Sequence, residues 1–381
     1  MPAPLSHPIV RRVFSTQAAM LAAGLDALIV THLPNLRYLT GFSGSAGAAI
    51  ITRSTCTLIV DFRYVTVGRA LVDRADTDAL QFLQAEASYD ETIVRVLQSE
   101  RVQRIGIEAA WMPVSRFNHL SRLLAPAHGG GLTEQAGCPA LVPTERMIER
   151  GRIVKDPVEI ATLREGARRL SAVARILPAL ARAGRAEADV ASDVEAAMRR
   201  EGFERPAFET IVASGPNGAL PHARPGARVL CDGDGVVLDF GGVYDGYCVD
   251  LTRTIQLGTC APEFRRIFAA VAEAHAAALA AVRPGRPATA VDRAARAVLE
   301  RHGLGDAFGH GTGHGLGLEV HEEPRIAKPA SGLPDVALEP GMVFTIEPGA
   351  YVEGLGGVRI EDDVLVTAGG CEILTDAPVE M

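Results

Sequence analysis

The sequence predicts an α+β protein of two domains, with a smaller N-terminal α/β domain at residues 1–135 and a larger domain at residues 143–381. The length of 381 residues corresponds to two domains of unequal size at about 150 residues per domain. In the first third of the chain, short apolar runs alternate with helix-like stretches, which is typical of α/β domains. A loop-like stretch rich in glycine and proline, 126–142, separates this pattern from the next.

The strands of the N-terminal domain are expected where aliphatic and β-branched residues form short runs. These runs are 27–30, 48–51, 57–60 and 105–107, and a helix is expected at 91–98. Strands interleaved with helices at this spacing indicate an α/β sheet with helical connections.

The C-terminal domain is predicted to begin with a helix that starts after Asp156. Asp156 is a favourable N-cap residue, Pro157 suits the first helical position, and Glu159 completes a capping box. This helix is expected to end near residue 181. Further helices are expected at 187–201, 262–282 and 288–302, and strands at 236–254 and 342–367. This order is typical of helices packed on an antiparallel sheet.

Composition indicates which classes of partner and which cellular compartment to expect. The 38 Lys and Arg residues against 46 Asp and Glu residues give a net charge of −8, so we expect neither nucleic acid nor a membrane as a partner. No apolar run reaches the roughly 20 residues that cross a bilayer. The six cysteines form no Cys-x-x-Cys pair and indicate free thiols in a reducing compartment. Arg11 and Arg12 resemble an export signal only faintly, because Asp26 interrupts the following stretch, and a cytoplasmic location is expected.

A predicted hairpin brings two aspartates together. Asp245-Gly246 is typical of a two-residue hairpin turn. With this turn at the centre, Asp239 faces Thr252, and Asp250 lies two residues further along on the same face. Carboxylates so close repel each other. They are tolerated either at a wet sheet edge or where a multivalent cation neutralises them.

A second acidic pair follows the same logic. A hairpin that turns at the glycine-rich segment around Gly354 sets Glu347 across from Glu361. Pro348 weakens this register because it cannot donate to a ladder. Taken alone, Glu347 is also consistent with an ordinary strand-end residue.

A glycine- and histidine-rich segment, 309–322, lies between the acidic pairs. Its three histidines are His310, His314 and His321. The alternating glycines do not fit a phosphate-binding G-x-G-x-x-G frame, but they allow imidazoles to crowd one centre. The zinc motif H-E-x-x-H is absent, because Arg325 stands at the second histidine position. A single histidine is usually structural, whereas three in so short a segment favour a site.

Two aspartates, two glutamates and at least one histidine form an oxygen-rich set that suits divalent cations. The four carboxylates balance the charge of two such ions; Mn²⁺ is the expected ion, with Co²⁺, Zn²⁺ and Fe²⁺ as alternatives. Two neighbouring ions activate a water molecule and polarise a carbonyl or phosphoryl oxygen. The set therefore predicts a hydrolase.

These segments resemble the pita-bread metallopeptidases, a family that includes methionine aminopeptidase, prolidase and aminopeptidase P. The resemblance covers 142–381 and rests on five motifs in the family's order. The motifs are Leu238–Gly241, Asp250–Thr254, Gly313–Gly315, Thr345–Gly349 and Arg359–Asp362. The resemblance implies a pita-bread fold for this domain. It also implies five metal ligands, Asp239, Asp250, His314, Glu347 and Glu361.

The same resemblance implies roles toward substrate. His222 and His321 would donate hydrogen bonds to the substrate and to its tetrahedral intermediate. Glu347 would also carry a proton to the leaving nitrogen of proline. His310 would line the proline pocket, and Arg359 would bind substrate, as in proline-specific members. For Arg359 a salt bridge to a neighbouring carboxylate is the competing interpretation.

The N-terminal segments 35–47 and 61–64 resemble the creatinase-like domain of aminopeptidase P and its bacterial relatives. In that family this domain often completes the active site of a neighbouring subunit. The resemblance therefore implies a homodimer, with Arg37 and Tyr38 as candidates at the shared site. A serine hydrolase is disfavoured, because the segment from Gly41 ends in Ser45 and is not a G-x-S-x-G elbow.

The expected function is that of an Xaa-Pro aminopeptidase, which uses two metal ions to hydrolyse the bond between an N-terminal residue and a following proline. The expected partners are therefore proline-containing peptides. Xaa-Pro dipeptidase (prolidase) is the alternative within the class. A metal-free creatinase-like hydrolase and a non-catalytic binding module are alternatives outside it, and the presence of all five ligand residues argues against both.

Overall fold

The computed structural model describes residues 8–75, 77–125, 139–328 and 335–379. The chain divides into two compact units, Met1–Arg152 and Ile153–Met381. Most of the expected boundary segment, 126–142, lies outside the described residues. The first unit extends beyond it because the strand Ala140–Thr144 pairs with the strand Arg104–Glu108 of the same unit.

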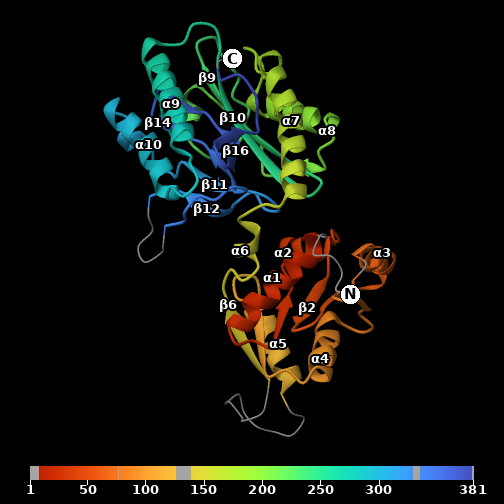
Figure 1. The fold of residues 1–381 in the computed structure, drawn as a ribbon. Coiled ribbons are helices and arrows are strands. Elements are labelled where there is room, and N and C mark those ends of the chain that lie inside the picture. The colour runs from red at the N-terminus through yellow and green to blue at the C-terminus, as the bar shows by residue number, and fades with distance from the viewer. Residues whose placement is uncertain (1–7, 76, 126–138, 329–334, 380–381) are drawn as a thin grey trace. The chain divides into compact units, whose positions relative to one another are not determined.

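The first unit is an α/β domain built on a six-stranded sheet with the order β4-β3-β2-β1-β5-β6 (Figure 1). Its strands are β1 Ala27–Val30, β2 Ala48–Thr52, β3 Cys56–Val60, β4 Leu80–Gln84, β5 Arg104–Glu108 and β6 Ala140–Thr144. Its helices are α1 Pro8–Ala22, α2 Leu33–Thr40, α3 Val65–Ala75, α4 Tyr89–Ser99, α5 Val114–Leu124 and α6 Glu149–Arg152, with the 3₁₀ turn η1 Phe62–Tyr64. The predicted α/β domain and its four predicted strands are confirmed.

Strand β1 shows why these runs become strands. Ile29 packs with Ile93 of α4 and Leu120 of α5, and Leu28 on the opposite face is also fully buried. A strand buried on both faces needs an apolar residue at every position, which explains the continuous run Ala27–Val30.

The second unit carries four long helices around antiparallel strands. The helices are α7 Pro157–Leu180, α8 Glu187–Arg200, α9 Pro262–Ala281 and α10 Ala288–Arg301, with the 3₁₀ turns η2 Gly215–Ala219 and η3 Gly305–Ala307. The strands are β7 Arg205–Pro206, β8 Ile211–Ser214, β9 Gly235–Tyr244, β10 Tyr247–Gln256, β11 Gly313–Gly315, β12 Glu322–Ile326, β13 Val343–Ile346, β14 Gly349–Val352, β15 Gly356–Arg359, β16 Asp362–Thr367 and β17 Gly370–Ile373. No helix in the described residues is long and apolar enough to cross a membrane.

The second unit has two halves that are built alike. Figure 1 shows α7 and α8 on one side of strands β9, β10 and β16, and α9 and α10 on the other. Helices α8 and α10 each follow a short backbone bridge, Ala186 with Val229 and Pro287 with Ala337. Each helix pair covers its own apolar core, one with β9 and β10 and one with β13 to β16. The strands therefore lie between two helical layers.

The start of α7 and the first hairpin form as predicted. The Asp156 side chain accepts hydrogen bonds from the backbone of the first turn and forms the expected capping box. Strands β9 and β10 pair with Asp239 opposite Thr252, so the predicted register is confirmed. Asp245 and Gly246 have φ of 44° and 71°, the left-handed conformation that a type I′ turn requires.

The second acidic hairpin has the predicted register and an interruption. Strands β14 and β15 pair Gly349 with Arg359, and strands β13 and β16 pair Ile346 with Asp362. The residues between these two ladders include Glu347 and Glu361, so the two glutamates face each other across the gap. The ladder is interrupted here because the backbone N–H groups of Glu347 and Glu361 donate to other segments.

Those donors connect the hairpin to the rest of the unit. The Glu347 N–H donates to the Thr312 carbonyl at 2.7 Å, next to the histidine-rich segment. The Glu361 N–H donates to the Thr252 carbonyl at 3.1 Å, on the strand that carries Asp250. One interrupted hairpin therefore brings the three ligand-bearing segments together.

Candidate metal centre

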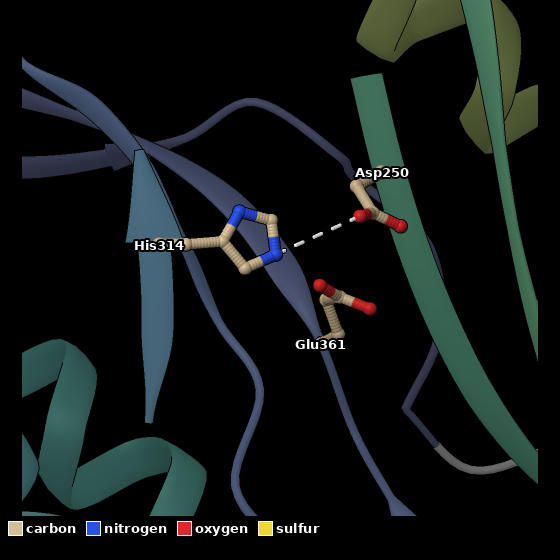
Figure 2. A group of neighbouring side chains, drawn as sticks. All are labelled: Asp250, His314 and Glu361. Atoms are coloured by element: carbon tan, nitrogen blue, oxygen red, sulfur yellow. Dashed lines mark ion pairs between the residues drawn. The ribbon is translucent and has the colours of Figure 1, made fainter. Parts of the chain in front are cut away.

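Three side chains from separate segments of the second unit converge. Asp250 lies on β10, His314 on β11, and Glu361 in the gap between β15 and β16. One ligand atom from each lies within 4.8 Å of the others (Figure 2). The His314 Nε2 atom lies 4.0 Å from an Asp250 carboxylate oxygen. The three side chains therefore have the spacing of a metal site.

The other two predicted ligands lie beside this group. An oxygen of Glu347 is 3.5 Å from the Nε2 atom of His314. Asp239 on β9 lies one strand from Asp250, and its charge is among the causes that raise the pKa values of Asp250, Glu347 and Glu361. The structure thus brings Glu347 and Asp239 close to the group of three, and a site made of all five side chains stays a prediction.

Burial and mutual repulsion dominate the electrostatics of the carboxylates. Burial and then the charge of Glu361 raise the pKa of Asp250 well above its ordinary value. Burial and then the charge of Glu347 do the same for Glu361. The pKa of Glu347 is raised to about 8, chiefly by burial. In such surroundings the charged form of a carboxyl group is unfavourable, and a nearby cation stabilises it.

The histidine of the cluster is in the form that binds metals. Burial, and then the neighbouring His321, lower the pKa of His314 to about 4. The imidazole is therefore neutral near pH 7 and offers a nitrogen lone pair. Its Nε2 atom faces the carboxylates, while Nδ1 lies 3.1 Å from the Gly315 carbonyl oxygen.

The residues present fit a divalent cation. In the described part of the chain, the Oδ1 atoms of Asp239 and Asp250 are buried and receive no hydrogen bond. A buried acceptor that receives no hydrogen bond costs free energy unless a positively charged group, such as a metal ion, lies against it. Four carboxylates and one imidazole are a hard, oxygen-rich donor set, which suits divalent first-row cations.

Several residues that support the ligands were not assigned from the sequence. The Thr252 hydroxyl donates to Glu361 Oε2 at 2.5 Å. The Asp363 carboxylate accepts the Asp250 backbone N–H at 3.0 Å. The predicted register already placed Thr252 opposite Asp239, so the sequence did contain a sign that Thr252 lies next to the predicted ligands. No comparable pattern pointed to Asp363.

Arg359 makes the salt bridge that was its competing interpretation. Its guanidinium is buried and donates to Asp239 Oδ2 at 2.5 Å and to the Tyr351 hydroxyl at 2.8 Å. Tyr351 was missed by the sequence analysis, although it lies on β14 just after Glu347. Arg359 is therefore paired directly with Asp239, one of the predicted ligands.

The three further histidines lie around the same site. His310 Nε2 lies 2.9 Å from the Tyr351 hydroxyl oxygen, and burial lowers the pKa of His310 to about 4. The His321 ring lies edge-on to the His314 ring, with 4.3 Å between centroids. His222 is exposed on the segment after η2, and its nearness contributes to the lowered pKa values of His310 and His321. His222 is therefore within electrostatic reach of both His310 and His321.

Tyr38 was expected as a candidate at a shared site, and the structure argues against it. The side chain is only 6% exposed, and its hydroxyl donates to the Gly151 carbonyl at 2.8 Å within the first unit. The Arg12 guanidinium stacks on its ring at 4.4 Å. Tyr38 therefore stabilises its own unit. Arg37 lies on the same helix and is partly exposed.

Known proteins match both units. Residues 161–368 match metallopeptidase family M24, and residues 12–154 match the Creatinase/Prolidase N-terminal domain. Peptidase YqhT of Bacillus subtilis is 35% identical over 94% of this chain and 96% of its own. The Xaa-Pro dipeptidase from Bacillus anthracis has a TM-score of 0.89 at 32% identity and covers 98% of this chain and 100% of its own. The X-Pro aminopeptidase from Thermotoga maritima has a TM-score of 0.81 at 32% identity and covers 95% of this chain and 98% of its own.

The fold and the site define a metal-dependent peptidase with a separate N-terminal domain. The chain belongs to metallopeptidase family M24. The predicted family resemblance and the predicted fold class are both confirmed.

Metal binding should release protons and strengthen as the pH rises. A carboxyl group whose pKa is raised to about 8, such as Glu347, is protonated below that pH and must lose its proton to become a ligand. Affinity for Mn²⁺ should therefore increase from about pH 6 to about pH 8. Isothermal titration in buffers of different ionisation enthalpy measures the released protons. Binding heats that do not depend on the buffer would contradict this prediction.

Proposed function

We propose that this protein hydrolyses the peptide bond between an N-terminal residue and a following proline, with two divalent metal ions held by five side chains. The proposed ligands are Asp239, Asp250, His314, Glu347 and Glu361. One observation carries the proposal, namely the convergence of Asp250, His314 and Glu361, next to two buried aspartate oxygens that receive no hydrogen bond from the described residues. Manganese is the proposed ion, because the donors are mostly carboxylate oxygens.

Metal ions held at this position would supply positive charge that polarises the scissile carbonyl and acidifies a water molecule. Glu347 would accept a proton from the attacking water and donate it to the leaving nitrogen of proline. The Nε2 atom of His314 faces the carboxylates. Because the lowered pKa keeps this imidazole neutral, Nε2 has a lone pair to offer a cation. Thr252 keeps Glu361 in one orientation through its hydroxyl.

We propose that His222 and His321 bind the substrate. Both side chains are partly exposed, and partial burial, followed by the charge of His222, lowers the pKa of His321. A neutral imidazole still donates one N–H to a carbonyl oxygen whose charge grows in the transition state. His310, next to Tyr351, is the proposed wall of the proline pocket, and Arg359 borders the same space.

Two candidate activities differ in substrate length. An aminopeptidase accepts peptides that continue beyond proline, and the similarity to the X-Pro aminopeptidase from Thermotoga maritima supports this activity. A dipeptidase accepts only the Xaa-Pro pair, and the similarity to the Xaa-Pro dipeptidase from Bacillus anthracis supports that activity. We propose the aminopeptidase, with the dipeptidase as the second candidate.

A substrate panel tests both parts of the proposal. We expect the Mn²⁺-loaded enzyme to cleave alanyl-proline and alanyl-prolyl-alanine, and to leave trialanine largely intact. Cleavage of the dipeptide alone would support the dipeptidase instead. Equal cleavage of trialanine would contradict proline specificity. Metal analysis of the active protein should give two ions per chain.

The cytoplasmic location and the homodimer expected from the sequence are part of the same proposal. The described cysteines are free thiols, as in proteins of reducing compartments. Light scattering of the purified protein measures the oligomeric state directly.

A further inference from the structure

Glu187 is the first residue of α8, and its carboxylate lies outside the metal cluster. The side chain is fully buried. A buried carboxylate is stable only when hydrogen bonds or a cation satisfy its oxygens. Among the described residues, the donors that satisfy Glu187 all come from the segment 214–226, a loop that begins at the end of β8 and includes η2.

The loop meets this carboxylate at three points. Ser214 donates its backbone N–H at 2.8 Å and its hydroxyl at 2.7 Å to Glu187 Oε1. The Asn217 amide lies 3.1 Å from both oxygens. The Gly226 backbone N–H donates to Oε2 at 3.3 Å. Both ends of the loop are therefore tied to the same side chain.

His222 lies between these tethers. The preceding carbonyl, of Pro221, accepts a hydrogen bond from Arg359 at 3.3 Å. The following residue, Ala223, is buried in a small apolar cluster with Ile211 and Val237. The loop is thus attached to the metal-site hairpin at its middle and to Glu187 at its ends.

Close packing leaves the loop little freedom to shift. Gly218 of the loop lies against Gly357 of β15, where an added Cβ on Gly357 would lie 2.1 Å from the Gly218 carbonyl oxygen. Arg228 adds a further restraint, since it donates to the Ser214 hydroxyl at 2.5 Å and to Asp234 at 2.7 Å.

We infer that Glu187 is a positioning residue that fixes the loop carrying His222 in the orientation needed for substrate. It does not touch the reacting atoms, and it acts through the loop. The inference rests on the proposed role of His222. Glutamine at this position would keep the size of the side chain but would turn an N–H₂ group toward a backbone N–H donor, that of Ser214 or that of Gly226. The loop would then lose at least one of its tethers.

Kinetics in two backgrounds test the inference. We expect Glu187→Gln to lower kcat by about 10- to 100-fold, as misplacement of a binding group does, with unchanged metal content. In a His222→Ala background the same substitution should cost less than about twofold, because the group it positions is already gone. Asp189→Asn is the matched control, since it removes an exposed carboxylate from the same first turn of α8 and should leave kcat unchanged.

Hydrogen exchange gives a readout that does not depend on activity. Amides of 214–228 should exchange faster in Glu187→Gln than in the wild type, while amides of α10 exchange as before. If Glu187→Gln fails to fold, Asn217→Ala removes one tether and should show the same pattern with a smaller loss. Unchanged exchange, or an equal loss of kcat with and without His222, would overturn the inference. A wild-type enzyme without peptidase activity would instead contradict the proposed function, and the exchange result would still test the tether.

Discussion

We expect Glu361→Gln to lower kcat/KM for a proline peptide by about 10³-fold or more, because a lost metal ion removes several kcal/mol of transition-state stabilisation. Glutamine keeps the shape of the side chain and can still accept the hydrogen bond from Thr252. It lacks the negative charge that balances a divalent cation. Bound metal should fall together with activity, and both are measured on the same sample by elemental analysis and by peptide hydrolysis.

Glu353→Gln is the control for this substitution. Glu353 is exposed near the turn of the same β14–β15 hairpin, so its replacement removes the same charge away from the cluster. We expect wild-type activity and metal content. A Glu361→Gln protein that retains both would show that Glu361 is not a ligand.

The second large effect is a loss of stability, which we expect when Arg253 is replaced. This side chain is fully buried and donates to the carboxylate of Asp362 at 2.7 Å. It also donates to the Glu361 carbonyl at 2.6 Å and to the carbonyls of Ala377 and Pro378 at 2.8 Å each. We expect Arg253→Met to reduce the free energy of unfolding by about 3–5 kcal/mol, because it leaves the buried Asp362 carboxylate without the arginine that pairs with it. Urea denaturation followed by circular dichroism measures the change.

Three further variants separate the charge from the packing. Arg253→Lys keeps the charge but not the planar fork, so its loss should be smaller. Adding Asp362→Asn to Arg253→Met should recover part of the loss, since the stranded charge disappears. Arg266→Met, on the exposed face of α9, should change stability by less than about 0.5 kcal/mol. A loss in Arg253→Met as small as in this control would contradict the prediction.

Local patterns predicted much of this protein. The capping signals at Asp156 predicted the start of α7, and the Asp245-Gly246 turn predicted the register of β9 and β10. Register has a period of two residues in a strand, so one turn position determines which carboxylates share a face. The pairing of Glu347 with Glu361 followed from the same rule, even though Pro348 interrupts the ladder.

Interactions between distant segments could not be predicted in this way. The tether from Glu187 to the loop, the contact of Arg359 with Asp239, and the burial of Tyr38 all depend on how separate elements pack. Tyr38 was expected at a site shared between subunits because its sequence context resembles that of a family domain. Its actual partner, the Gly151 carbonyl, is far away in the chain, and nothing in the residues around Tyr38 indicates it.

The sequence by itself determined the four long helices of the second unit and the two hairpins, because backbone hydrogen bonding and side-chain alternation follow local residue patterns. The five candidate ligands were named from these hairpins together with the resemblance to the metallopeptidase motifs. The tertiary structure alone decided which buried polar groups support them, namely Thr252, Tyr351, Asp363 and the anchors Glu187 and Arg253. The physical reason is that a buried polar group must find its partners wherever packing places them. Those partners come from elements far apart in the chain, so their positions follow only from the complete fold.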